Sequence, residues 1–124
     1  MASDDAMTFA RVWERSVEVR SDEIFLIFEG PDGRTVQWTY GHFDALVART
    51  AGLLAGKGVT PGDCVHVALA NCPAFVAVWL ASMRLGAWFV PSDPMGGVDE
   101  LAGHIARTRP VVGFCASARA EVYR

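Results

Sequence analysis

Hydrophobic residues in the first part of the chain predict an amphipathic helix. Phe9, Trp13 and Val17 recur at helical spacing within residues 6–20, and charged residues fill positions between them. Since an amphipathic helix buries its apolar stripe, we expect the charged side of this helix to face solvent.

Two strand-like segments come next, at 23–29 and 35–40, and a turn that contains Pro and Gly joins them. In the second segment Val36, Trp38 and Tyr40 alternate with polar residues. Strict alternation places the apolar side chains on one side of a strand. We therefore expect a β-hairpin with one buried face.

The rest of the chain alternates between strands and helices. Thr39 is a suitable N-cap for one helix, and Pro73 suits the first turn of a later one. Such alternation is typical of βαβ units with a parallel sheet, so we expect an α/β fold. The expected elements are a helix that ends at 56–58, a strand at 64–70, a helix at 73–85 that is apolar on nearly every side, a strand at 87–91, a helix over 98–108, a strand at 111–115 and a helical start at 117–124.

Composition and charge narrow the class of protein. The chain has 124 residues, 52% of them hydrophobic, which is enough for the core of one domain. Its net charge of -3 gives no reason to expect nucleic acid or an anionic membrane as a partner. The longest apolar run, at 74–81, is far shorter than the roughly 20 residues of a spanning helix. Cys64, Cys72 and Cys115 are odd in number and scattered, so we expect a reducing cytoplasm.

Several short motifs between residues 39 and 101 follow one another in a distinctive order and spacing. Their residues are Thr39, Tyr40, Phe43, Asp44, Gly58, Val59, Gly62, Asp63, Val65, Asn71, Pro73, Phe75, Gly86, Ala87, Pro91, Pro94, Glu100 and Leu101. Together they resemble the N-terminal region of the adenylate-forming (AMP-binding) enzymes, among them acyl-CoA synthetases, luciferases and nonribosomal peptide adenylation domains. The segment NCPAFVAVW looks most like the carnitine and crotonobetaine CoA ligases.

The resemblance implies an enzyme that activates a carboxylic acid with Mg-ATP. The products of that step are an acyl-adenylate and pyrophosphate, and the acyl group then passes to the thiol of coenzyme A or of a carrier protein. The intact protein would thus be an ATP-dependent acid–thiol ligase. The identity of the acid and of the acceptor thiol stays open at this point.

The segments on which this chemistry depends in the family are missing from these residues. The chain has no Pro-Lys-Gly phosphate loop, no Tyr-Gly-x-Thr-Glu segment and no C-terminal catalytic lysine. We therefore expect residues 1–124 to be the N-terminal subregion of an AMP-dependent synthetase/ligase domain, truncated on its C-terminal side. In this role they would be scaffold, with no catalytic, cofactor-binding or metal-binding residue and no adenylation activity alone.

The turn at 91–97 is the segment whose sequence most resembles a ligand site. Gly96 and Gly97 precede a predicted helix, and helix N-termini attract phosphate. Ser92 and Asp93 could contact a ligand, but both also suit a turn that ends a strand. Since no Lys, Ser or Thr accompanies the glycines in PMGG, we interpret the segment as a corner between strand and helix.

Histidines, cysteines and tryptophans are the remaining candidates for chemistry. They could act as general bases, as nucleophiles or metal ligands, and as stacking platforms, respectively. No cysteine has a Cys or His partner at ligand spacing, and the tryptophans have apolar spacing, so we expect the cysteines and tryptophans in the core. The residues concerned are His42, His66 and His104, the three cysteines, and Trp38, Trp79 and Trp88.

Two other classes of protein stay open from the sequence. A non-catalytic interaction subunit or relic would recruit a partner chain through an exposed sheet edge. A small flavodoxin-like nucleotide binder would use the turn at 91–97 as its phosphate site. The first needs an unpaired strand edge, and the second needs phosphate-binding geometry at that turn.

Overall fold

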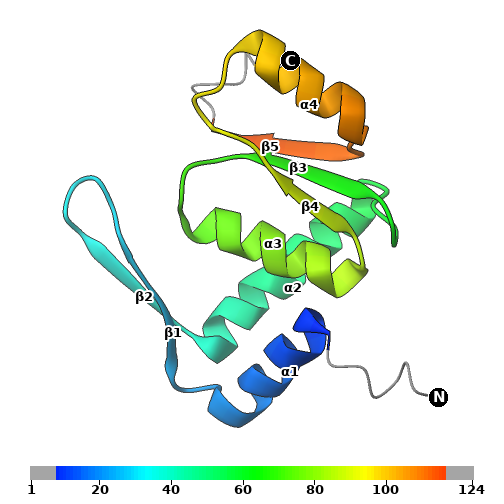
Figure 1. The fold of residues 1–124 in the computed structure, drawn as a ribbon. Helices are drawn as coiled ribbons and strands as arrows, with labels where there is room; N and C mark the ends of the chain where they lie inside the picture. The colour runs from blue at the N-terminus through cyan, green and yellow to red at the C-terminus, as the bar shows by residue number, and fades with distance from the viewer. Residues whose placement is uncertain (1–7, 117–124) are drawn as a thin grey trace.

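A computed structural model describes residues 8–116, which form the elements in the expected order (Figure 1). Most boundaries differ from the expected ones by a few residues at most, and the expected helical start at 117–124 lies outside the described residues. The elements are α1 (Phe9–Arg20), β1 (Ile24–Glu29), β2 (Thr35–Thr39), α2 (Tyr40–Gly56), β3 (Cys64–Ala68), α3 (Pro73–Leu85), β4 (Trp88–Pro91), α4 (Val98–Thr108) and β5 (Val112–Cys115).

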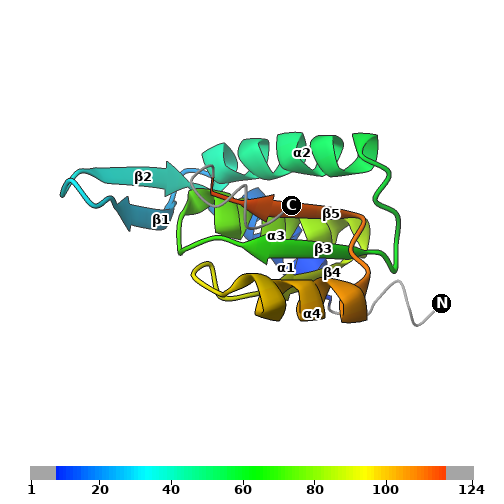
Figure 2. The ribbon, with the colours of Figure 1, turned by 90° about the horizontal axis from the view of Figure 1, so that it is seen from above.

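A parallel sheet of three strands, in the order β4-β3-β5, organises the second half of the chain. Figure 1 shows α4 on one side of this sheet and α2 with α3 on the other, while α1 packs beyond them. In the view from above, α2 lies on the side of β5 and α4 on the side of β4 (Figure 2). The predicted α/β fold with a parallel sheet is therefore confirmed.

The hydrophobic core lies between the sheet and the helices α2 and α3. Val65 and Val67 point into it from the central strand and are fully buried. As its sequence predicts, α3 is buried on more than one side, because it packs against α2, α1 and β4. The other buried apolar residues of the core are Trp13, Phe43, Val47, Ala51, Leu54, Val59, Ala77, Val78, Leu80, Ala81 and Ala87.

An aromatic cluster joins α1 and the hairpin to this core. The ring of Phe43, on α2, is fully buried and lies 5.2 Å from the ring of Phe25 and 5.5 Å from that of Trp38. The ring centroid of Trp13, on α1, lies 4.6 Å from that of Phe25, and the two rings pack edge to face. Thr39 is the N-cap of α2, as predicted, since its hydroxyl accepts the N–H of His42 at 3.1 Å.

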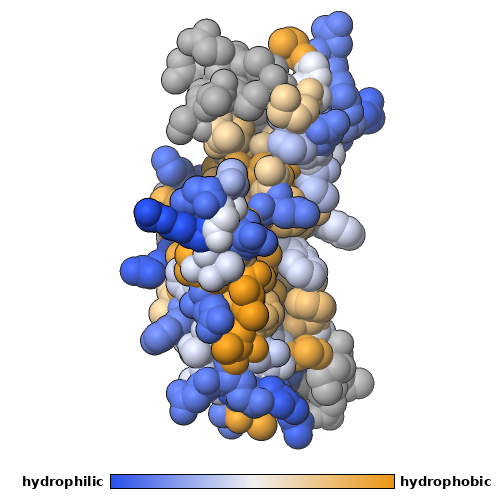
Figure 3. Space-filling view, turned by 90° about the vertical axis from the view of Figure 1, so that its left-hand side faces the viewer, coloured by the Kyte–Doolittle hydropathy of each residue, from blue (hydrophilic) through white to orange (hydrophobic). Residues whose placement is uncertain are grey.

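The hairpin of β1 and β2 was expected to have one buried face, and it is buried only near its base. Phe25 and Trp38, near its base, pack against the core, but Ile27 is 58% exposed and Val36 is 48% exposed. In Figures 1 and 2 the hairpin projects from one end of the molecule, so its outer half lies beyond the core that residues 8–116 form. Figure 3 shows hydrophobic side chains at the surface on this side. Tyr40, expected as the last strand residue, is the first residue of α2.

Trp88 is not the core residue that its apolar surroundings in the sequence predict, because 67% of it is exposed. Its neighbour Phe89 faces α3, with its ring 5.3 Å from that of Phe75. Successive side chains of a strand point to opposite faces, so Trp88 points away from the core. Trp38 and Trp79 are half-buried and do pack in aromatic contacts, as predicted.

Candidate functional site

The turn that follows β4 is closed by the backbone and side chain of Asp93. The Asp93 carboxylate accepts the N–H of Met95 at 2.8 Å, and its carbonyl oxygen accepts the N–H of Gly96 at 3.0 Å. An aspartate that bonds the backbone two residues ahead is typical of a tight turn. The interpretation of this segment as a corner between strand and helix is therefore confirmed.

The same turn does not fit the phosphates of a nucleotide. Gly97 is the N-cap of α4, and the first turn of that helix already carries two carboxylates, Asp99 and Glu100. A carboxylate oxygen of Glu100 lies so close to Gly96 that an added Cβ there would be 3.0 Å from it. Carboxylates at a helix N-terminus take the place of an anionic ligand and repel a second one. The residues of this turn therefore do not fit the phosphates of Mg-ATP.

We expect ATP, AMP and a flavin nucleotide to leave the melting temperature of the chain unchanged. A ligand that binds the folded state alone raises the free energy of unfolding by RT ln(1 + [L]/Kd), so binding would appear as a saturable rise. The measurement is a thermal melt across a concentration series of each nucleotide. A saturable rise that Gly96→Val abolishes would contradict this prediction and favour the nucleotide-binder hypothesis.

Three polar side chains that the sequence places far apart meet on the α4 side of the sheet. His66 lies on β3, Ser92 follows β4, and His104 lies on α4. The Ser92 hydroxyl oxygen is 2.8 Å from His66 Nε2 and 2.7 Å from His104 Nδ1. His66 is fully buried, and the other two residues are half-buried. Ser92 thus bridges two imidazoles and ties α4 to the sheet.

Burial lowers the pKa of His66 below its ordinary value of 6.5, and the nearby His104 lowers it further. Residue-by-residue reasoning missed this cluster, which we name the His66–Ser92–His104 bridge. One signal could have found it: adjacent parallel strands bring their carboxyl ends together, and His104 lies at helical spacing from the buried Leu101. His42 is exposed on α2 and is not part of it.

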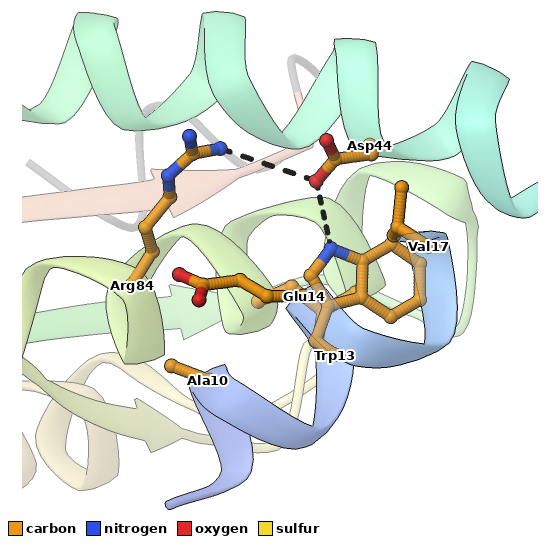
Figure 4. Close-up of a pocket in the computed structure, with 7 residues that line it drawn as sticks. Ala10, Trp13, Glu14, Val17, Asp44 and Arg84 are labelled. Carbon is orange, nitrogen blue, oxygen red and sulfur yellow. Dashed lines mark hydrogen bonds and ion pairs between the residues drawn. The ribbon is translucent and has the colours of Figure 1, made fainter. Parts of the chain in front are cut away.

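A small pocket between α1, α2 and α3 is the second polar feature (Figure 4). In it the indole N–H of Trp13 donates to Asp44 at 2.9 Å, and Arg84 forms an ion pair with the same carboxylate at 4.0 Å. Both dashed contacts in Figure 4 converge on one Asp44 oxygen, so this carboxylate is already engaged. The cavity of about 160 Å³ is lined by Ala10, Trp13, Glu14, Val17, Asp44, Leu80 and Arg84.

Two of the residues that carry the family resemblance, Asp63 and Gly86, form parts of turns and helix ends in the structure. Asp63 closes the turn before β3, since its carboxylate accepts both the N–H and the hydroxyl of Thr60 at 2.8 Å. The same two bonds lower the pKa of Asp63. Gly86 ends α3 with φ +73°, a conformation that favours glycine, and its carbonyl accepts the N–H of Gly62.

Cysteines and other metal ligands do not form a centre in the described part of the chain. Cys64, Cys72 and Cys115 are free and half-buried rather than fully in the core. Across residues 8–116 no group of three or more His, Cys, Asp or Glu side chains is placed to hold a metal ion. No helix in that range is long and apolar enough to cross a membrane.

Comparison with known proteins assigns the chain to a family. Residues 13–123 match the family of AMP-binding enzymes, so the chain belongs to that family. It is 36% identical to the crotonobetaine/carnitine–CoA ligase of Salmonella paratyphi A over 81 residues, which is 65% of this chain. The matched segment spans only 16% of that ligase.

Solved structures show the same fold. A fatty acyl CoA synthetase of Mycobacterium tuberculosis superimposes with a TM-score of 0.83 at 22% identity, covering 93% of this chain and 22% of its own. The acyl-CoA synthetase of Brucella canis superimposes with a TM-score of 0.85 at 20% identity, covering 94% and 21%. The expected fold, an N-terminal part of the AMP-binding domain, is therefore confirmed. Neither the partner-recruiting relic nor the flavodoxin-like binder is favoured by any of these findings.

Proposed function

We propose that the chain is the N-terminal scaffold of an ATP-dependent acid–thiol ligase that works through an acyl-adenylate. The match of residues 13–123 to the AMP-binding family is the observation that carries this proposal. The described residues add support. The carboxylates of Asp44 and Asp63 accept hydrogen bonds from within the chain, and Gly86 ends α3. In this role residues 1–124 supply no catalytic, cofactor-binding or metal-binding side chain.

The name of one relative supports a proposal for the substrate class of the intact enzyme. The Salmonella protein of 36% identity is named a crotonobetaine/carnitine–CoA ligase, so we propose a short, polar carboxylic acid as the substrate of the intact enzyme. ATP, Mg²⁺ and coenzyme A or a carrier protein would be its other partners, and nucleic acid would not. The three free thiols, at half-buried positions, support a reducing cytoplasm as its location.

A chimera tests the proposal. Residues 13–123 would replace the corresponding segment of the Salmonella ligase, and acid-dependent exchange of pyrophosphate into ATP would be measured with crotonobetaine and carnitine. We expect exchange by the chimera and none by the 124-residue chain alone, because phosphate-transfer chemistry needs charged groups positioned around the phosphates and metal. A chimera with Phe43→Asp is the control, since a charge at this buried position prevents folding.

Two results would overturn the proposal. Exchange by the purified chain alone would mean that these residues hold their own adenylation site. A chimera that has a cooperative melt but no exchange with any acid in a panel of short polar acids would mean that residues 13–123 do not serve as the scaffold of such a ligase.

A further inference from the structure

We propose that the pocket between α1, α2 and α3 binds a small organic cation of the alkylammonium class (Figure 4). The pocket is a cavity of about 160 Å³. At about 30 Å³ for each molecule of liquid water, this is the volume of roughly five waters. Pockets that bury drug-sized ligands usually measure about 300–1,000 Å³. A ligand of a few heavy atoms therefore fits the cavity, and a nucleotide or coenzyme A does not.

The charged side chains around this pocket have an excess of negative charge. Glu14 on α1 and Asp44 on α2 each bring a carboxylate, and Arg84 on α3 brings a guanidinium. Among the lining residues that the structure describes, two negative charges thus face one positive charge. A concave site with an excess of one sign raises the local concentration of ions of the opposite sign. The pocket therefore favours a cation over an anion.

Arg84 neutralises this site only in part. Its guanidinium lies 4.0 Å from Asp44 Oδ1, a separation too long for a hydrogen bond, and both side chains are partly exposed to water. Ion pairs of this kind contribute little to stability, so a second cation can compete with Arg84 for the carboxylate. In Figure 4 the Glu14 side chain extends from α1 toward Arg84, but no ion pair joins these two within residues 8–116.

The shape of the ligand follows from the donors, acceptors and apolar groups in the pocket. An ionised carboxylate has about four acceptor sites, and the indole N–H of Trp13 uses one of those on Asp44, at 2.9 Å. An ammonium group has N–H donors and no acceptor, so it suits the sites that remain. The apolar side chains of Ala10, Val17 and Leu80 line the same cavity and would contact a short alkyl chain. An alkylammonium ion combines the charged donor with the apolar body.

A cation in this pocket would link helices from distant parts of the sequence. Glu14 belongs to α1, and Asp44 belongs to α2. The ion would therefore favour the docked position of α1, because a ligand that binds the folded state alone stabilises that state. Binding would not depend on the proposed role as a ligase scaffold, since the residues that form the pocket lie within α1, α2 and α3. An inactive chimera would leave the expected binding unchanged.

The indole N–H signal of Trp13 reports directly on the pocket. The probe is n-propylammonium chloride, titrated into the whole isotope-labelled chain while sodium chloride keeps the ionic strength constant. Proton–nitrogen correlation spectra follow the four tryptophan indoles, and Trp13→Phe identifies the signal of Trp13. We expect a saturable shift of this signal, because the ammonium group competes with the indole N–H for the same carboxylate. The indole of Trp88, which is 67% exposed and does not line the pocket, should not shift.

Two substitutions of exposed side chains should change the affinity in opposite directions. Glu14→Gln removes one carboxylate and should raise the dissociation constant of n-propylammonium by up to about fivefold, the effect of one exposed ion pair. Arg84→Gln removes the competing cation and should lower that constant by a similar factor, a gain that a misfolded chain cannot show. Glu18→Gln is the matched control, because it neutralises an exposed carboxylate of α1 that does not line the pocket.

Three outcomes would overturn the proposal. The first is a Trp13 signal that does not shift, or that shifts equally with sodium chloride alone. The second is a saturable shift with sodium propionate in place of n-propylammonium, or an affinity that Arg84→Gln weakens, either of which would make the pocket an anion site. The third is equal affinity in Glu14→Gln and Glu18→Gln, which would place the bound cation elsewhere.

Discussion

Phe43→Ala is expected to lower the free energy of unfolding by about 3–5 kcal/mol, the usual cost of truncating a buried phenylalanine. Phe43 is fully buried, and the rings of Phe25 and Trp38 lie 5.2 Å and 5.5 Å from its own. Its removal leaves a cavity at the junction of α2 with the hairpin, where the neighbouring rings are large and cannot all move inward. A loss of this size is a large fraction of the stability of an ordinary domain, about 5–15 kcal/mol.

Urea denaturation followed by circular dichroism measures this loss as a shift of the midpoint. Trp88→Ala is the matched control, because it removes a larger aromatic side chain from a position that is 67% exposed. Surface substitutions usually change stability by no more than about 0.5 kcal/mol. Equal shifts in the two variants would show that Phe43 does not occupy a packed core.

Trp13→Ala is the substitution with the second largest expected effect, again about 3–5 kcal/mol. Trp13 is the buried residue of α1, and its ring lies 4.6 Å from Phe25 and 5.6 Å from Tyr40. Its indole N–H also donates to Asp44 at 2.9 Å. Without this side chain α1 loses both its aromatic packing against the core and its hydrogen bond to Asp44. The backbone amides of α1 should therefore exchange hydrogen faster than those of α2.

Trp13→Phe separates the two contributions. Phenylalanine keeps the aromatic packing but leaves the Asp44 carboxylate without the indole donor, so we expect a loss of about 1.5–3 kcal/mol, the range for a hydrogen bond to a charged group. Asp44→Asn retains an acceptor oxygen and should cost less than Trp13→Phe. If Trp13→Ala shifts the urea midpoint no further than Trp88→Ala does, α1 is not docked through Trp13.

Elements with a strong local signal were predictable from the sequence. Thr39 caps α2 with its hydroxyl, and Pro73 opens α3 at a position where its missing N–H costs nothing. The corner after β4 also followed from local chemistry, because Asp93 bonds the backbone two residues ahead. In each case the information lies within four residues of chain.

The solvent exposure of individual side chains was less predictable, because it depends on which other elements of the fold pack against them. Val36 alternates with polar neighbours as a buried strand residue would, yet it is 48% exposed since the hairpin projects beyond the core. Trp88 has apolar neighbours on both sides, but only Phe89 faces the helices. Sequence pattern shows that two faces differ, and the tertiary fold decides which of them is covered.

The candidate site was the least predictable part, because its members come from three elements. His66 and His104 are 38 positions apart in the sequence, and Ser92 lies between them. Their meeting needs the parallel pairing of β3 with β4 and the placement of α4 over that face. The family resemblance does not supply it either, since none of the three is among the residues that carry the resemblance.

The central claim, that this chain is the scaffold of an adenylating ligase and holds no adenylation site of its own, is tested most directly by pyrophosphate exchange. The measurement compares the purified 124-residue chain with the chimera in which residues 13–123 stand in the Salmonella ligase. The account predicts acid-dependent exchange by the chimera and none by the chain. Exchange by the chain alone, or a folded chimera that is inactive with every acid, would contradict it.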